Sequence, residues 1–171
     1  MVLSLSSLHA GLSITTGGRL RSRQELKERI IALFNSAREH VWMCSSLNPQ
    51  FYNDEDVKKA IVNAINRVKE FRLLVDCSEE EFDNLRKGLG WLFDAMIKSK
   101  TRFHVRRIRG ARHVIIVDDK HVRFEEFHER NEIRVEGNTI LMNASKSYIF
   151  YAKVLFLKYW NEASEVGLKR D

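Results

Sequence analysis

Four consecutive apolar residues, Val114 to Val117, lie between a basic cluster at 106–112 and the two carboxylates Asp118 and Asp119. Strands that are covered on both faces lose the alternation of polar and apolar residues, so this run predicts a buried strand. The charged groups on either side of it cannot be buried in the same way. We therefore expect the strand to carry them to the rim of a sheet, where a functional site is most readily built.

The segments around this strand alternate between helical and strand-like patterns. Apolar residues recur with the helical period in four segments, which begin near Ser22, Asn53, Ser78 and Ser145. Strand-like runs cover residues 41–46, 71–75, 101–108, 114–117, 121–127 and 132–142, with a tight hairpin turn at Gly137-Asn138 inside the last run. Alternating helices and strands predict an α/β fold, with a mixed β-sheet flanked by helices.

The chain has 171 residues, of which 44% are hydrophobic, and this is enough for one domain with its own core. We expect that domain to span residues 21–164. Residues 1–20 are rich in Ser, Thr and Gly, which predicts an N-terminal tail, an edge strand, or the end of a linker from an upstream domain. Residues 165–171 are expected to form a C-terminal tail.

The formal net charge of +6 favours polyanionic partners, such as nucleic acid, phospholipid headgroups or a phosphorylated ligand. The alternative is an ordinary solvated surface rich in Lys and Arg. Cys44 and Cys77 occur in apolar, strand-like runs and are expected to be buried free thiols, which suits a cytoplasmic protein. No apolar run approaches the ~20 residues of a membrane span, and the N-terminus lacks the pattern of a signal peptide.

Motifs that bind cofactors or supply common catalytic groups are not found in the sequence. The glycines Gly88 and Gly90 lie within a helical pattern, which they weaken or bend, and do not follow a strand as a nucleotide-binding loop would. There is no G-x-S-x-G, H-E-x-x-H or C-x-x-C motif. We expect no cofactor, and Asp118 and Asp119 predict a turn at the end of a strand rather than a metal site.

Four features in this order resemble a phospholipase D-like domain, and together they cover residues 22–163. The features are a helix followed by a strand that ends in Ser45-Ser46, the helix VKKAIVNAINRVKEF leading into LLVD, the segment VIIVDDK, and the terminal aromatic helix FLKYW. The resemblance implies the fold of that superfamily. It also implies a homodimer, because members with one catalytic motif pair two copies of it across a single site.

Active members of the superfamily carry a His-x-Lys-x4-Asp motif, followed after about six residues by Gly-Ser-x-Asn. The His is the phosphoryl-accepting nucleophile, and the Lys and Asn hold phosphate oxygens. When the apolar strands are aligned, Asp118 matches the Asp of the motif. The other positions are occupied by Ala111 for His, His113 for Lys, and Glu125, Glu126 and His128 for Gly, Ser and Asn.

Alanine cannot accept a phosphoryl group, and two glutamates would repel a phosphodiester, so no catalytic residue is expected. A second register keeps an alternative open, in which the chain is a nuclease or phosphodiesterase with a rearranged site that uses His113 as nucleophile, with Asp118. In that register Ile115 replaces the Lys and Lys120 replaces the Asp of the motif.

A basic cluster remains at the predicted rim, and it consists of Arg106, Arg107, Arg109, Arg112 and His113. Arginine forks suit bidentate contacts with phosphate, so the cluster predicts binding of an anion or of a nucleic-acid backbone. The alternative is that these charges pair with nearby glutamates, at 79–81 and 125–126. The sequence thus favours a non-catalytic binding or regulatory domain that forms a homodimer. A DNA-associated domain with nonspecific phosphate contacts is the other binding hypothesis.

Overall fold

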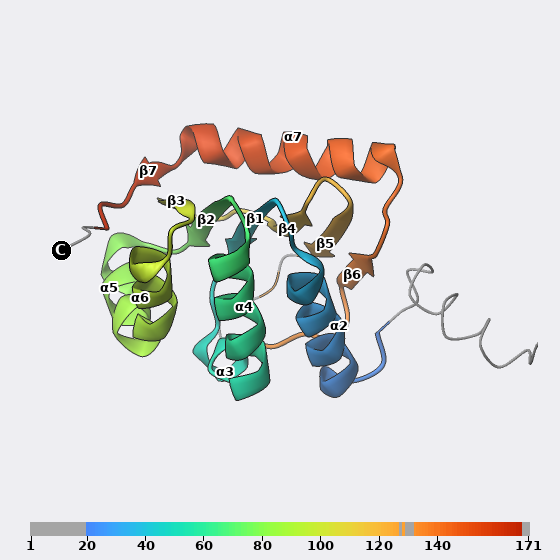
Figure 1. Ribbon diagram of the computed structural model, residues 1–171, viewed down its shortest axis with the longest axis horizontal. Helices are drawn as coiled ribbons and strands as arrows, with labels where there is room; N and C mark the ends of the chain where they lie inside the picture. The colour runs from blue at the N-terminus through green and yellow to red at the C-terminus, as the bar shows by residue number, and fades with distance from the viewer. Residues whose placement is uncertain (1–19, 127, 129–131, 169–171) are drawn as a thin grey trace, which may run out of the picture.

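The computed structural model describes residues 20–126, 128 and 132–168, and it forms one mixed sheet with helices on both faces (Figure 1). The strands are β1 (His40–Ser45), β2 (Glu70–Asp76), β3 (Arg102–Ile108), β4 (His113–Val117), β5 (His121–Glu125), β6 (Asn138–Leu141) and β7 (Ser164–Glu165). The helices are α2 (Arg23–Ser36), α3 (Pro49–Tyr52), α4 (Glu55–Arg67), α5 (Glu79–Gly88), α6 (Gly90–Lys98) and α7 (Lys146–Glu162). The predicted α/β class is confirmed.

The strand order across the sheet is β6-β5-β4-β1-β2-β3-β7. Strands β1, β2 and β3 are parallel, whereas β4 is antiparallel to β1, and β5 and β6 continue the antiparallel pairing. As a result, the carboxyl ends of β1, β2 and β3 share one edge of the sheet with the start of β4, the end of β5 and the start of β6. Polar residues at these six strand ends are therefore brought close together.

Helices α2 to α6 cover one face of the sheet, and α7 crosses the other face alone (Figure 1). All five residues of β4 are buried, as its apolar run predicts. The face beneath α7 is packed by aromatic rings, where Phe156 stacks on Trp42 and Trp160 at centroid distances of 5.4 and 5.5 Å. Both cysteines are buried and free, as predicted.

Three local details differ from the sequence-based expectations. The helical pattern after Ser78 is divided at Leu89 into α5 and α6, between the two glycines that weaken it. The run 132–142 contributes only one strand, β6, and Gly137 (φ 81°) lies in the turn before that strand, so the predicted internal hairpin is wrong. The segment around Pro49, the one proline of the sequence, predicts a loop but forms the short helix α3.

The ends of the chain add one element that the sequence does not predict. Strand β7 lies at the border of the expected C-terminal tail and pairs with β3, where Arg106 is opposite Glu165 and Arg107 is opposite Ser164. The predicted N-terminal tail lies almost wholly outside the described residues, as does the last residue of the strand predicted at 121–127. Among the helices of the described residues, none is long and apolar enough to cross a membrane.

Candidate functional site

A buried cluster of ionisable side chains occupies the shared edge of the sheet. The β4–β5 register places His113 opposite Glu125, and the imidazole Nδ1 lies 3.0 Å from the carboxylate Oε2. On the other side of the ring, Nε2 lies 3.2 Å from Oδ2 of Asp76 at the end of β2. The His113 side chain is 8% exposed, so both of its ring nitrogens face carboxylates in a nearly dry environment.

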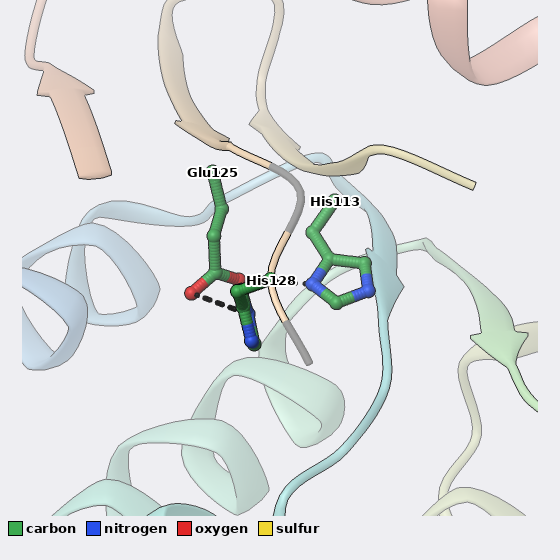
Figure 2. Close-up of side chains that lie close together, drawn as sticks. All are labelled: His113, Glu125 and His128. Atoms are coloured by element: carbon green, nitrogen blue, oxygen red, sulfur yellow. Dashed lines mark hydrogen bonds and ion pairs between the residues drawn. The ribbon is translucent and has the colours of Figure 1, made fainter. Parts of the chain in front are cut away.

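Glu125 is the centre of this cluster, because it also contacts residues from three other positions. Its Oε1 lies 2.9 Å from Nη2 of Arg123 and 3.2 Å from Nε2 of His128, and it accepts a longer hydrogen bond of 3.4 Å from the amide of Asn138. Figure 2 shows the side chains of His113 and His128 beside the Glu125 carboxylate. The carboxylate is thus surrounded by donors and cations.

These contacts shift the titration of both partners. Burial alone would raise the pKa of Glu125, but Arg123 and the hydrogen bonds from His113 and His128 hold it well below its usual range. Burial alone would lower the pKa of His113, but its hydrogen bonds to Asp76 and Glu125 raise it. Both shifts favour the charged forms, so the cluster is an internally neutralised set of ions.

The position that the resemblance assigns to the nucleophile is filled by apolar packing. Ala111 is 1% exposed and belongs to the hydrophobic cluster beneath α7, with Val114 and Phe156 among its members. A side chain there has no polar partner to activate it and no access to a ligand. The structure therefore offers no nucleophile at residue 111.

Asp118 lies at the opposite end of β4 from His113, so the pair proposed for the alternative catalytic site does not meet. Its carboxylate accepts hydrogen bonds from the backbone N–H groups of Arg38, Glu39 and His40, at 2.7, 2.8 and 2.9 Å. The neighbouring Asp119 forms ion pairs with His40 and Lys153. Both aspartates have positive φ in the turn before β5, which fits their prediction as a strand-end turn.

The structure divides the predicted anion-binding residues into two groups. Arg106 donates to the carbonyl oxygen of Trp160 at 2.7 Å and pairs with Glu165, and Arg107 pairs with Glu79. These two guanidinium groups are thus engaged by the protein itself. The pair between Arg107 and Glu79 is one of those expected if the basic cluster is neutralised by nearby glutamates.

The remaining basic residues of the predicted set differ in exposure. His113 is enclosed in the cluster described above, whereas Arg109 and Arg112 are exposed in the segment between β3 and β4. Neither arginine forms an ion pair with the part of the chain that the structure describes. They are the members of the set whose side chains are open to solvent.

Four ionisable residues of the cluster were not assigned a role from the sequence, namely Asp76, Arg123, Glu125 and His128. A signal for two of them was nevertheless available. The motif alignment places His113, Glu125 and His128 at the Lys, Gly and Asn positions, which in active members surround one phosphate. Residues at those positions are expected to converge, and the ligand atoms of these three side chains lie within 4.8 Å of one another.

Two cavities border the cluster. One of about 30 Å³ is lined by Ser45, Ser46, Arg123, Glu125 and His128, among others. Another of about 190 Å³ opens on the side of α7 and is lined by Arg112, His113 and Glu125, together with residues of α7. Glu125 therefore lines both cavities.

The fold is that of a phospholipase D-like domain. The chain is similar to the crystal structure of a phospholipase D family member, Nuc from Salmonella typhimurium, with a TM-score of 0.59 and 16% identity over 81% of this chain and 89% of that chain. It is also similar to NucT from Helicobacter pylori, with a TM-score of 0.52 and 17% identity over 84% of this chain and 94% of that chain.

A third similar structure is that of TrmBL2, described as an archaeal chromatin protein with a novel mode of DNA binding. The TM-score is 0.53 with 16% identity, and the match covers 95% of this chain and 60% of that chain. No protein-family model and no curated protein matches the sequence. At these identities the similarities establish the fold.

Proposed function

We propose that this chain is a non-catalytic phospholipase D-like domain that binds nucleic-acid backbone or another phosphate-bearing ligand in a regulatory role. The observation that carries the proposal is the buried Ala111 at the nucleophile position. Without an imidazole at that position, the fold lacks the group that forms the covalent phosphoryl intermediate. The proposed role is therefore binding rather than hydrolysis.

The alternative nuclease, with His113 as nucleophile, is disfavoured by the contacts of that ring. A nucleophilic imidazole needs one nitrogen with a lone pair directed at phosphorus, but both nitrogens of His113 face carboxylates. The Glu125 carboxylate also lies between the Lys and Asn positions of the motif, where active members place the substrate phosphate. The protein thus supplies its own anion there, and a phosphodiester would be repelled.

The exposed arginines between β3 and β4 support binding of phosphate outside this cluster. Arg109 and Arg112 lie three residues apart at the functional edge of the sheet, and arginine is suited to bidentate phosphate contacts. The net charge of +6 favours approach to a polyanion. The similarity of fold to a DNA-binding chromatin protein adds support, so duplex DNA is the ligand that we propose to test.

We further propose that the domain forms a homodimer in the cytoplasm. Helix α7 carries four large apolar side chains at least half exposed to solvent, namely Tyr148, Phe150, Tyr151 and Val154. An exposed apolar patch of this kind is typical of a protein–protein interface. The buried free thiols suit a reducing compartment.

Binding to a fluorescent DNA duplex across a salt series tests the binding proposal. We expect affinity to fall as salt rises, and the double variant R109A/R112A to bind more weakly with a salt slope smaller by about 2. The control is R86A/K87A, which removes two exposed positive charges from α5. The duplex should remain intact throughout. Absence of affinity at ~50 mM salt, or affinity that does not depend on salt, would refute phosphate contacts.

Sedimentation at micromolar concentration tests the homodimer. We expect a dimer for the wild-type chain and a shift toward monomer for Phe150→Glu, since Phe150 is 70% exposed and its replacement does not disturb the core. A wild-type chain that sediments as a clean monomer would refute dimerisation. The result is independent of the DNA measurement.

A further inference from the structure

We propose that His113, Glu125 and His128 form a binding site for a divalent transition-metal ion of the zinc type. Their ligand atoms already lie within 4.8 Å of one another (Figure 2). His113 Nδ1 is 3.0 Å from Glu125 Oε2, and His128 Nε2 is 3.2 Å from Glu125 Oε1. Ligand atoms around tetrahedral zinc lie roughly 3.4 Å apart, because zinc–nitrogen bonds are about 2.0–2.1 Å long. Small side-chain rotations would therefore suffice to bind the ion.

Asp76 supports the assignment of His113 as a ligand, because its carboxylate contacts the ring nitrogen that faces away from Glu125. Metal-binding histidines usually donate their second ring N–H to a carboxylate, which fixes the tautomer and orients the ring. His113 has this arrangement, since Nε2 lies 3.2 Å from Asp76 Oδ2 while Nδ1 faces Glu125. Asp76 also accepts a hydrogen bond from the backbone N–H of Gly110, which holds the carboxylate in place.

The charges around the site are compatible with a divalent ion. Arg123 pairs with Oε1 of Glu125 and donates through Nε to the Asn138 side chain at 2.7 Å, so the guanidinium is held on one side of the carboxylate. Oε2 faces His113 and is the oxygen that the ion would contact. The negative charges of Asp76 and Glu125 then face the positive charges of Arg123 and the ion. The ion takes the place of the proton that His113 shares with Glu125.

The donor set points to the class of ion. Two imidazoles and one carboxylate, with a further position left for water, are typical of zinc and of neighbouring borderline metals rather than of Mg²⁺ or Ca²⁺, which prefer oxygen ligands. The cavity of about 190 Å³ that His113 and Glu125 line offers a route of entry. This inference does not depend on the proposed DNA binding, which rests on Arg109 and Arg112.

The test uses the full chain without a polyhistidine tag, first stripped with a chelator. Zn²⁺ is titrated by calorimetry, and Co²⁺ is used as a spectroscopic probe of nitrogen ligation. We expect one ion per chain and a loss of binding in His128→Ala, whereas His104→Ala, at an exposed strand position, should bind like the wild type. Asp76→Asn should weaken binding by about 10–100-fold, because it perturbs the partner of a ligand.

Equal affinity of wild type and His128→Ala for Zn²⁺ would overturn the assignment, as would the absence of binding to a folded wild-type chain. Circular dichroism checks that each variant is folded. If His128→Ala proves unfolded, His128→Gln replaces it, because glutamine keeps a polar side chain at that position while removing the imidazole ligand. A chain that binds DNA in a salt-dependent way but does not bind zinc would refute the metal site alone. A chain that binds zinc but does not bind DNA would refute the proposed function alone.

Discussion

The imidazole Nδ1 of His113 lies 3.0 Å from Oε2 of Glu125, because the β4–β5 register makes the two residues neighbours. In the motif alignment these are the Lys and Gly positions of a phosphodiesterase. His113 occupies the position of the lysine that holds the substrate phosphate in active members, and here it holds the carboxylate of Glu125. In the proposed non-catalytic role, an internal anion thus takes the place of the external one.

Removing the charge of Glu125 is expected to destabilise the domain strongly. Glu125→Gln leaves the cation of Arg123, whose side chain is 5% exposed, without its carboxylate partner. Breaking a buried ion pair from one side typically costs about 3–5 kcal/mol. Urea unfolding in the presence of a chelator measures the change in the free energy of unfolding.

A double-mutant cycle provides the control for this prediction. Replacing both Arg123 and Glu125 by leucine removes the charges together, so the double variant should lose less stability than the sum of the two single variants. Additive losses would show that the two side chains are not coupled, against the contacts described above.

Asp118 is expected to matter for stability rather than for catalysis. Asp118→Ala removes the acceptor for three backbone N–H groups between α2 and β1 and places alanine at a φ of 54°. We expect a loss of about 2–3 kcal/mol, since hydrogen bonds to charged groups are among the stronger ones. Thermal or urea unfolding measures it.

Two further variants serve as controls for Asp118→Ala. Asp118→Asn should lose less than Asp118→Ala, because asparagine keeps one acceptor oxygen and tolerates the left-handed backbone. Asp83→Ala, at an exposed position of α5, should change the unfolding free energy by less than about 0.5 kcal/mol. An Asp118→Ala variant as stable as Asp83→Ala would contradict the structural role.

The stability of the domain should fall in mild acid through His121. Burial and the nearby Lys120 lower the pKa of His121, although Asp118 opposes the shift. The Nδ1 atom of His121 accepts a hydrogen bond from the backbone N–H of Asn143 at 2.9 Å. A lowered pKa means that the folded state resists protonation. The contribution of neutral His121 to the free energy of unfolding is present above the ordinary histidine pKa of about 6.5 and is lost as the pH falls below that value.

The comparison that checks this pH dependence is between wild type and His121→Gln. Glutamine can accept the same hydrogen bond but does not titrate, so the wild type should lose stability relative to the variant between pH 7.5 and pH 5.5. Unfolding curves at several pH values give the difference. A constant difference across this range would show that His121 does not carry the effect.

The fold was predictable because its main elements have local signals. Helical periods, the capping box at Ser78 and the apolar run of β4 each appear within a short segment, and all are found in the structure. Elements without such signals were missed. Strand β7 has two residues, and it exists through its pairing with β3, which lies about 60 residues earlier in the chain.

The candidate site was predictable only in part, since its contacts join distant segments. The alignment with a catalytic motif directed attention to His113 and its surroundings. It could not show that Asp76, 37 residues away, faces the same ring, or that Arg106 is engaged by Glu165, 59 residues away. The spacing of His113, Glu125 and His128 matches no common metal motif, and the β4–β5 pairing is what brings them together.

The most direct test of the central claim is the turnover of a small phosphodiester reporter by the purified chain, with a chelator present, beside His113→Ala. Phosphodiesterases of this fold act through a histidine nucleophile, and His113, the histidine that the alternative register puts in that role, is held between Asp76 and Glu125. We predict no turnover above the buffer rate for either protein. Turnover by the wild type that disappears in His113→Ala would contradict the account.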